Sequence, residues 1–277
     1  HTLISMEKVD AAESTARECL RLGHELQDAY VQGHALMQIA SVNRLGGKNA
    51  CAEQHLLASI ERFQTSGDSG MHGIVLVNYG RFLYEKGDYT TARDHVTRAL
   101  AIFEEVGDTV RHSYALRNLG VIAVAQGDYA EAQALLNKAL KPIRRTGNLR
   151  HLIEIVDDMG RLAQLEGNYA GARTLLQESL ALSLEIEHAP WIARALEALG
   201  CLAAAKGQCE DATHLFGAAD AHAVATGTRL DPVWRAGHEH WVCVARTQLG
   251  EAAFSLAWAE GAASTLEQAV GYAAGSE

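Results

Sequence analysis

A glycine recurs every 40 residues in this sequence, at Gly80, Gly120, Gly160 and Gly200. A second glycine follows seven residues after each of these, and an alanine follows five residues later. These further positions are Gly87, Gly127, Gly167 and Gly207, and Ala92, Ala132, Ala172 and Ala212. A fixed period of roughly 20–50 residues is typical of solenoids. The spacing therefore predicts a chain of stacked repeats, each of which packs on its neighbours.

Each repeat has the signature of two helices joined by a tight turn. The turn reads Gly-Asp-Tyr at 87–89 and 127–129, and Gly-Asn-Tyr at 167–169. Glycine can end a helix because it enters the left-handed conformation at no steric cost. The Asp or Asn that follows can accept hydrogen bonds from the free N–H groups of the next helix. Alanine and leucine dominate the apolar residues, so the composition favours helix throughout.

The repeat divides the chain into three parts. Residues 1–32 are predicted to form an N-terminal half-repeat, residues 33–232 five whole repeats, and residues 233–277 the C-terminal capping helices. The last part holds three of the four tryptophans and predicts a longer helix to about Leu249, followed by two short ones. A solenoid needs such a unit because its end repeat must cover an open apolar face. The start at His1 is interpreted as a boundary inside a longer protein.

Charge and hydropathy exclude several classes of partner. The formal net charge is −10, and the 24 basic residues are scattered rather than clustered, which disfavours direct nucleic-acid binding. No apolar run approaches the length of a membrane-spanning helix, so we expect no membrane partner. The five cysteines are odd in number and widely spaced, which favours free thiols in a reducing compartment. The expected location is cytoplasmic.

The repeat resembles a known family. An apolar residue precedes the first glycine, the Gly-Asp-Tyr turn follows, and an Ala-Leu pair closes the pattern at 99–100 and 139–140. This resembles the tetratricopeptide repeat, although its usual length is about 34 residues. The resemblance implies an all-α fold: a right-handed, superhelical solenoid of 40-residue helix-turn-helix repeats with a C-terminal helical cap. It also implies that the first helices line a concave groove for a protein or peptide.

The C-terminal part carries a second resemblance. The segments 215–221, 249–254 and 257–261 are similar to the C-terminal part of large bacterial signal-transduction ATPases (STAND proteins), including LuxR-type and AfsR-type transcriptional regulators. This likeness implies that ATPase and DNA-binding domains lie elsewhere in the full-length protein and that the repeats are its sensing arm. The alternative is a free-standing scaffold or assembly factor. An upstream nucleotide-binding domain would favour the first interpretation, and its absence the second.

The repeat frame also suggests which side chains face the groove. Counting from residues 33, 73, 113, 153 and 193, we expect positions 2, 5, 6, 9 and 12 of each first helix to point inward, and we call them the inner positions. Position 6 gives a polar ladder of Gln38, Asn78, Asn118 and Asp158. Such amides can both donate to and accept from an extended peptide backbone. The flanking candidates are Arg81, Tyr84, Tyr114, Arg117, Asp157, Arg161 and Gln164.

Two alternatives to peptide binding stay open for this face. Its side chains can form a solvated surface on which repeat-related neighbours hydrogen-bond to each other, or the groove can take a small-molecule inducer. Arginine can hold a carboxylate or phosphate through paired hydrogen bonds. Pairing of two solenoids into a homodimer is a further possibility.

No catalytic, cofactor or metal motif is present, so we expect no enzyme. His238 and His240 point about 200° apart on a helix and cannot chelate one ion together. The segment 46–49 contains Gly-Lys but lacks the first glycine and the Ser or Thr of a phosphate-binding loop. No nucleophile motif surrounds a serine or cysteine. We therefore expect no catalytic residues, no cofactor and no metal.

Overall fold

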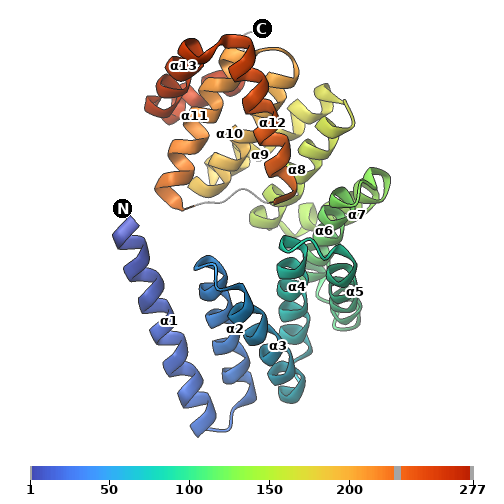
Figure 1. Cartoon of the computed structure of the whole chain (residues 1–277). Coiled ribbons are helices and arrows are strands. Elements are labelled where there is room, and N and C mark those ends of the chain that lie inside the picture. The colour runs from blue at the N-terminus through green and yellow to red at the C-terminus, as the bar shows by residue number, and fades with distance from the viewer. Residues whose placement is uncertain (1, 228–231, 275–277) are drawn as a thin grey trace. The chain divides into compact units, whose positions relative to one another are not determined.

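The computed structural model describes residues 2–227 and 232–274, and these residues contain helices and turns but no strand. The helices follow one another in tandem (Figure 1). They are α1 (Thr2–Glu25), α2 (Ala29–Leu45), α3 (Asn49–Ser66), α4 (Ser69–Glu85), α5 (Tyr89–Glu105), α6 (Thr109–Ala125), α7 (Tyr129–Thr146), α8 (Leu149–Leu165), α9 (Tyr169–Glu185), α10 (Ala189–Ala205), α11 (Cys209–Thr226), α12 (Pro232–Leu249), α13 (Glu251–Ala263) and α14 (Leu266–Ala274). The predicted all-α class and tandem repetition are confirmed. The part boundaries at 32 and 232 stay predictions.

The helices are separated by a left-handed residue at every twentieth position. Each of these residues has a positive φ, between 50° and 85°. The series is Gln27, Gly47, Gly67, Gly87, Gly107, Gly127, Gly147, Gly167, Glu187, Gly207 and Gly227. The 40-residue repeat therefore consists of two 20-residue steps, each with one helix and one turn.

Short polar side chains begin most of the repeat helices. Seven cap residues each accept a hydrogen bond from the backbone N–H three residues later. They are Asp28, Asp68, Asp88, Asp108, Asp128, Asn148 and Asn168. The caps expected in the three Gly-Asp/Asn-Tyr turns are thereby confirmed. Because a cap satisfies one of the free N–H groups of a helix start, it fixes where each helix begins.

The chain forms two compact units, residues 1–122 and residues 123–277, which are considered separately. In the first unit, apolar side chains on second helices fill the space beside glycines on first helices. A Cβ atom placed at Gly73 would lie 2.5 Å from the ring of Phe103, and one at Gly80 would lie 2.6 Å from Val96. The glycines therefore let paired helices approach closely. Phe63, Leu76 and Leu116 complete the buried interior.

The second unit runs from the last turn of α6 to α14. Its repeats keep the same close approach, with Gly160 against Leu176 and Gly200 against Phe216. After α11 the repeat ends, and α13 crosses α11 at backbone distance. A Cβ atom at Gly217 would lie 2.2 Å from the carbonyl oxygen of Trp258. As predicted, a longer helix ending at Leu249 and two shorter helices form this C-terminal part.

The helix α12 packs against α10 and α11, and α14 packs against α11 (Figure 1). The C-terminal part therefore covers the last repeat, as a solenoid end requires. None of the helices among the described residues is both long and apolar enough to span a membrane.

Replacing Glu187 by glycine should stabilise the chain. Glu187 holds a left-handed φ of 50° where most of the other turns have glycine. Glycine removes the steric strain of the Cβ atom in this conformation, but it also makes the unfolded chain more flexible. The net effect should be a rise of about 0.5–1 kcal/mol in the free energy of unfolding. Thermal and urea midpoints by circular dichroism measure this.

Gly167→Ala is the matched control for Glu187→Gly. Gly167 has a φ of 77°, and a Cβ atom added there would meet no heavy atom within 4 Å, so only backbone strain acts. This variant should lower the free energy of unfolding by about 1 kcal/mol. A lower midpoint for Glu187→Gly would contradict the strain argument.

Candidate functional site

The polar ladder at position 6 becomes less accessible along the chain. Gln38 is exposed on α2, and Asn78 is half-buried on α4, where its Nδ2 donates to Sδ of Met37 at 3.3 Å. Asn118 is buried on α6, and its Nδ2 donates to the carbonyl of Tyr114 at 2.8 Å. The first two members are therefore more accessible to a partner than Asn118.

The flanking candidates of the first unit divide in the same way. Arg81 is exposed on α4, with its Nε 3.4 Å from Oε1 of Glu85. The same oxygen accepts from Nη1 of Arg44 on α2 at 2.8 Å, which links two successive first helices. Tyr84 and Arg117 are buried. Tyr114 is half-buried on α6. The fully exposed polar groups on the inner positions of this unit thus lie on α2 and α4.

In the second unit, the inner positions form a buried ion network on α8. Arg161 Nε donates to Oδ2 of Asp157 at 2.9 Å, and its Nη2 donates to the carbonyl of Arg194 at 2.7 Å. The same Nη2 lies 2.7 Å from Oε2 of Glu197, in an alignment that makes this contact an ion pair rather than a hydrogen bond. Arg161 therefore joins α8 to α10.

A second arginine closes the network from α10. Arg194 Nε donates to Oδ2 of Asp157 at 2.7 Å, and its Nη2 donates to Oδ1 of Asp158 at 2.6 Å. Asp157 is 2% exposed, Asp158 is 0% exposed and Arg161 is 4% exposed. Paired charges of opposite sign allow such burial, because an isolated ion would be strongly disfavoured there.

The helix α12 lies over this network. The guanidinium carbon of Arg161 is 5.6 Å from the ring centre of Trp234, a cation–π contact. Trp234 is itself buried against Val124, Leu136 and Leu162. One turn later on α12, Nδ1 of His238 lies 3.1 Å from Oε1 of Glu197. The chain's own C-terminal part therefore occupies the inner face of α8 and α10.

The electrostatics keep Arg161 and Glu197 charged. Burial opposes the charge of Arg161, but the carboxylates of Asp157 and Glu197 outweigh it and raise the pKa of the guanidinium. Burial alone would raise the pKa of Glu197, yet Arg161 and the bond from His238 lower it to about 2. This ion pair is therefore charged on both sides at neutral pH.

Cys201 completes the cluster around Glu197. Its Sγ donates to Oε1 of Glu197 at 3.1 Å, from one helical turn further along α10. Burial and the nearby carboxylate raise the pKa of this thiol well above its ordinary value. Three buried polar atoms beside Arg161 have no hydrogen-bond partner among the described residues: Oδ1 of Asp157, Oε2 of Glu197 and Nε1 of Trp234.

Of the predicted residues in this unit, three meet in the network: Asp157, Asp158 and Arg161. The fourth, Gln164, is half-buried on α8. Five further residues were not predicted from the sequence: Arg194, Glu197, Cys201, Trp234 and His238. The first three occupy positions 2, 5 and 9 of the repeat that starts at residue 193, so the inner-position rule already places them inward, although the named candidates come from earlier repeats. No repeat rule reaches the two residues of α12.

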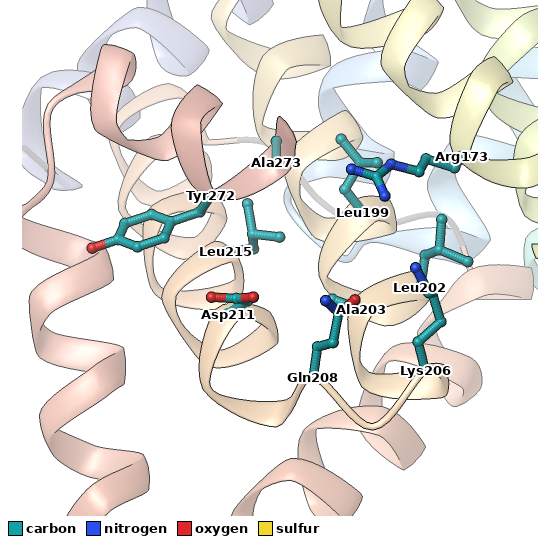
Figure 2. Close-up of a pocket in the computed structure, with 10 residues that line it drawn as sticks. All are labelled: Arg173, Leu199, Leu202, Ala203, Lys206, Gln208, Asp211, Leu215, Tyr272 and Ala273. Carbon is teal, nitrogen blue, oxygen red and sulfur yellow. The ribbon is translucent and has the colours of Figure 1, made fainter. Parts of the chain in front are cut away.

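A separate small pocket lies between α9, α10, α11 and α14 (Figure 2). It is lined by Arg173, Leu199, Leu202, Ala203, Lys206, Gln208, Asp211, Leu215, Tyr272 and Ala273. By helical spacing, its α10 residues lie on the side of that helix opposite Glu197 and Cys201. The pocket is therefore distinct from the ion network and follows the line along which α14 packs on the repeats.

The sequence matches the family model of the tetratricopeptide repeat over residues 72–141 and 152–219. The paired helices, the close-approach glycines and the turns described above agree with that match. The chain is a tetratricopeptide repeat protein. Tetratricopeptide repeats are protein-interaction modules, so this protein has an interaction or scaffold role. A comparison with curated protein sequences gives no match.

Solved structures show the same fold at low sequence identity. A Rap protein complexed with Competence and Sporulation Factor has a TM-score of 0.66 at 13% identity, covering 97% of this chain and 71% of that one. BtubC from P. vanneervenii has a TM-score of 0.63 at 16% identity, covering 80% and 93%. A STAND protein with a tetratricopeptide repeat sensor from Pyrococcus horikoshii has a TM-score of 0.62 at 17% identity, covering 96% and 42%.

Removing the central arginine of the network should strongly destabilise this tetratricopeptide repeat protein. Arg161→Met leaves the buried carboxylates of Asp157 and Glu197 without their main counter-charge. The expected loss is about 3–5 kcal/mol of unfolding free energy. Urea unfolding followed by circular dichroism measures it.

Arg81→Met is the matched control, because Arg81 occupies the same repeat position on α4 but is exposed. Its loss should cost less than about 1 kcal/mol. Equal and small effects of the two substitutions would show that the network does not hold buried charge.

Proposed function

We propose that this protein is the non-catalytic sensing and interaction arm of a bacterial STAND-type transcriptional regulator, and that a protein or peptide partner binds the inner face of α2 and α4. One observation carries the binding part. At inner positions of α2 and α4, Gln38, Asn78 and Arg81 present exposed or half-buried polar side chains. The equivalent positions of α8 and α10 are occupied by the chain's own ion network and by α12.

The chemistry of α2 and α4 suits an extended polypeptide. Gln38 and Asn78 offer amide donors and acceptors at 40-residue spacing, and Arg81 offers a guanidinium that can hold a carboxylate. Met37 and His34, both half-buried on α2, add apolar and aromatic contact area. A peptide or loop with backbone groups free to hydrogen-bond and an acidic side chain fits this surface.

The chemistry of the second unit supports a non-catalytic role. Its one dense cluster of titratable groups among the described residues is sequestered beneath α12. The thiol of Cys201, the group there with nucleophilic potential, is buried and has a raised pKa, whereas reactive cysteines have lowered values and are accessible.

The regulatory part of the proposal draws on the solved structures. The Pyrococcus protein is a signal-transduction ATPase with a tetratricopeptide repeat sensor, and the Rap protein is complexed with Competence and Sporulation Factor. By analogy, partner or inducer binding to this chain would be passed to ATPase and DNA-binding domains of the full-length protein. Pairing of two such arms in a homodimer is compatible with this role.

The alternative is a free-standing scaffold or assembly factor, which the interaction face of α2 and α4 would serve equally well. The two proposals differ in gene context. A nucleotide-binding domain encoded upstream in the same reading frame supports the regulator, and a complete gene without one supports the scaffold.

Partner capture should depend on α2 and α4. A photo-crosslinking residue in place of Gln38 in the full-length protein should give a discrete crosslinked partner in cells, identified by mass spectrometry. The variant Asn78→Ala with Arg81→Ala should weaken that capture at least about tenfold, the loss expected from two good polar contacts.

The control places the photo-crosslinker at Gln64 and the alanines at Thr97 and Arg98, which are exposed on the second helices α3 and α5. These changes should give no such crosslink and no loss of capture from position 38. Equal crosslinking from positions 38 and 64 would contradict binding at the inner face.

A further inference from the structure

Three side chains with metal-ligating atoms converge where α12 meets α10. They are the carboxylate of Glu197, the thiol of Cys201 and the imidazole of His238. Their ligand atoms all lie within 4.8 Å of one another. The sequence alone predicts no metal site, because His238 and its neighbour His240 point apart on one helix.

We propose that Glu197, Cys201 and His238 form a zinc site that joins α12 to the last repeat. The donor set supports this choice, since a thiolate, an imidazole nitrogen and a carboxylate oxygen are the three ligand types that zinc takes from proteins. Glu197 and Cys201 are spaced i, i+4 on α10, which places both on one face of the helix. His238 supplies the third ligand from α12.

The distances are close to those that coordination requires. Sγ of Cys201 and Nδ1 of His238 each lie 3.1 Å from Oε1 of Glu197. In a tetrahedral zinc site, with bonds of about 2.0–2.3 Å, ligand atoms stand about 3.3–3.7 Å apart. The two separations from Oε1 of Glu197 are thus slightly short. The third separation joins Sγ of Cys201 and Nδ1 of His238, and a small movement of the part-exposed His238 would bring it into this range.

The charge of the network also favours a divalent cation. The three carboxylates of Asp157, Asp158 and Glu197 face the two guanidinium groups of Arg161 and Arg194, which leaves a net charge of −1 among these five side chains. Zinc binding adds two positive charges and releases the thiol proton of Cys201 to solvent. The buried cluster then becomes neutral, which low-dielectric surroundings favour.

Arg161 does not block this site. Its Nη2 contacts Oε2 of Glu197, whereas the thiol and the imidazole both contact Oε1. A metal at Oε1 would therefore leave the arginine on the other oxygen, as the outer partner that ligating carboxylates commonly have. Three protein ligands leave the fourth position of zinc open to water or to a group from a partner.

The site has a consequence for α12. The metal would tie His238 to α10, and so add to the contact between Trp234 and Arg161 that holds the same helix. Zinc would then stabilise the covered state of the inner face of α8 and α10. This inference is independent of the partner-binding surface proposed on α2 and α4, which shares none of these residues.

Titration of the whole chain with Co²⁺ tests the proposal, because cobalt substitutes for zinc and reports its ligands by absorption. One equivalent should produce a near-ultraviolet thiolate-to-cobalt band and the visible bands of a tetrahedral ion, both removed by added Zn²⁺. Cys201→Ser should abolish the thiolate band, and His238→Gln should weaken Co²⁺ affinity at least about tenfold.

Two matched controls keep the result specific. Cys209→Ser changes another buried cysteine of the same unit, and His240→Gln changes an exposed histidine on α12. Both should titrate like the parent chain. Zn²⁺ should also raise the thermal midpoint of the parent chain but not that of Cys201→Ser, with folding of each variant checked by circular dichroism. A missing thiolate band, or one that persists in folded Cys201→Ser, overturns the proposal.

Discussion

The arrangement of this protein depends on a backbone constraint: a residue with left-handed φ at every twentieth position from 27 to 227. Such a residue lets a helix end and the next begin within a few residues, and glycine adopts the conformation at no steric cost. Because the interval does not vary, equivalent residues of successive repeats face the same direction around their helices. For this reason the inner positions recur at the same places in each first helix.

Equivalent inner positions serve different purposes in the two units. Position 9 holds exposed Arg81 on α4, buried Arg161 on α8 and buried Cys201 on α10. On α4 the side chain contacts an acidic neighbour and solvent. On α8 and α10 the same position lies beneath α12. One repeat frame therefore provides both the exposed polar surface on which we propose partner binding and a closed polar interior.

The buried ion network fixes the relative positions of α8, α10 and α12 more than it stabilises the fold. Taking charges from water has a desolvation cost that pairing repays only when the geometry is good. Here every charged member has a partner on another helix: Arg161 joins α8 to α10, and His238 joins α12 to Glu197. A shift of any of these helices would leave a buried charge unpaired, so the network fixes their relative positions.

Much of this fold could be predicted from the sequence, since the period, the caps and the turn glycines are local signals. The turn at Glu187 shows the limit, because the side chain gives no glycine signal while the backbone keeps the same φ. The inner-position rule identified Asp157, Asp158 and Arg161, and it also places Glu197 and Cys201 inward in the next repeat. It could not show that these residues are buried. That depends on Trp234 and His238 of α12, whose packing is a long-range contact outside the repeat.

The contrast between open and covered inner positions is the central claim, and thiol accessibility measures it directly. In a chain whose exposed cysteines Cys19, Cys51 and Cys243 are replaced by serine, Arg81→Cys introduces a thiol at the repeat position that Cys201 occupies naturally. The Arg81→Cys thiol should react with a maleimide as fast as an unhindered one. Cys201 should react more slowly by roughly 100-fold or more, since it must wait for local opening. Equal rates in the folded chain would contradict the account.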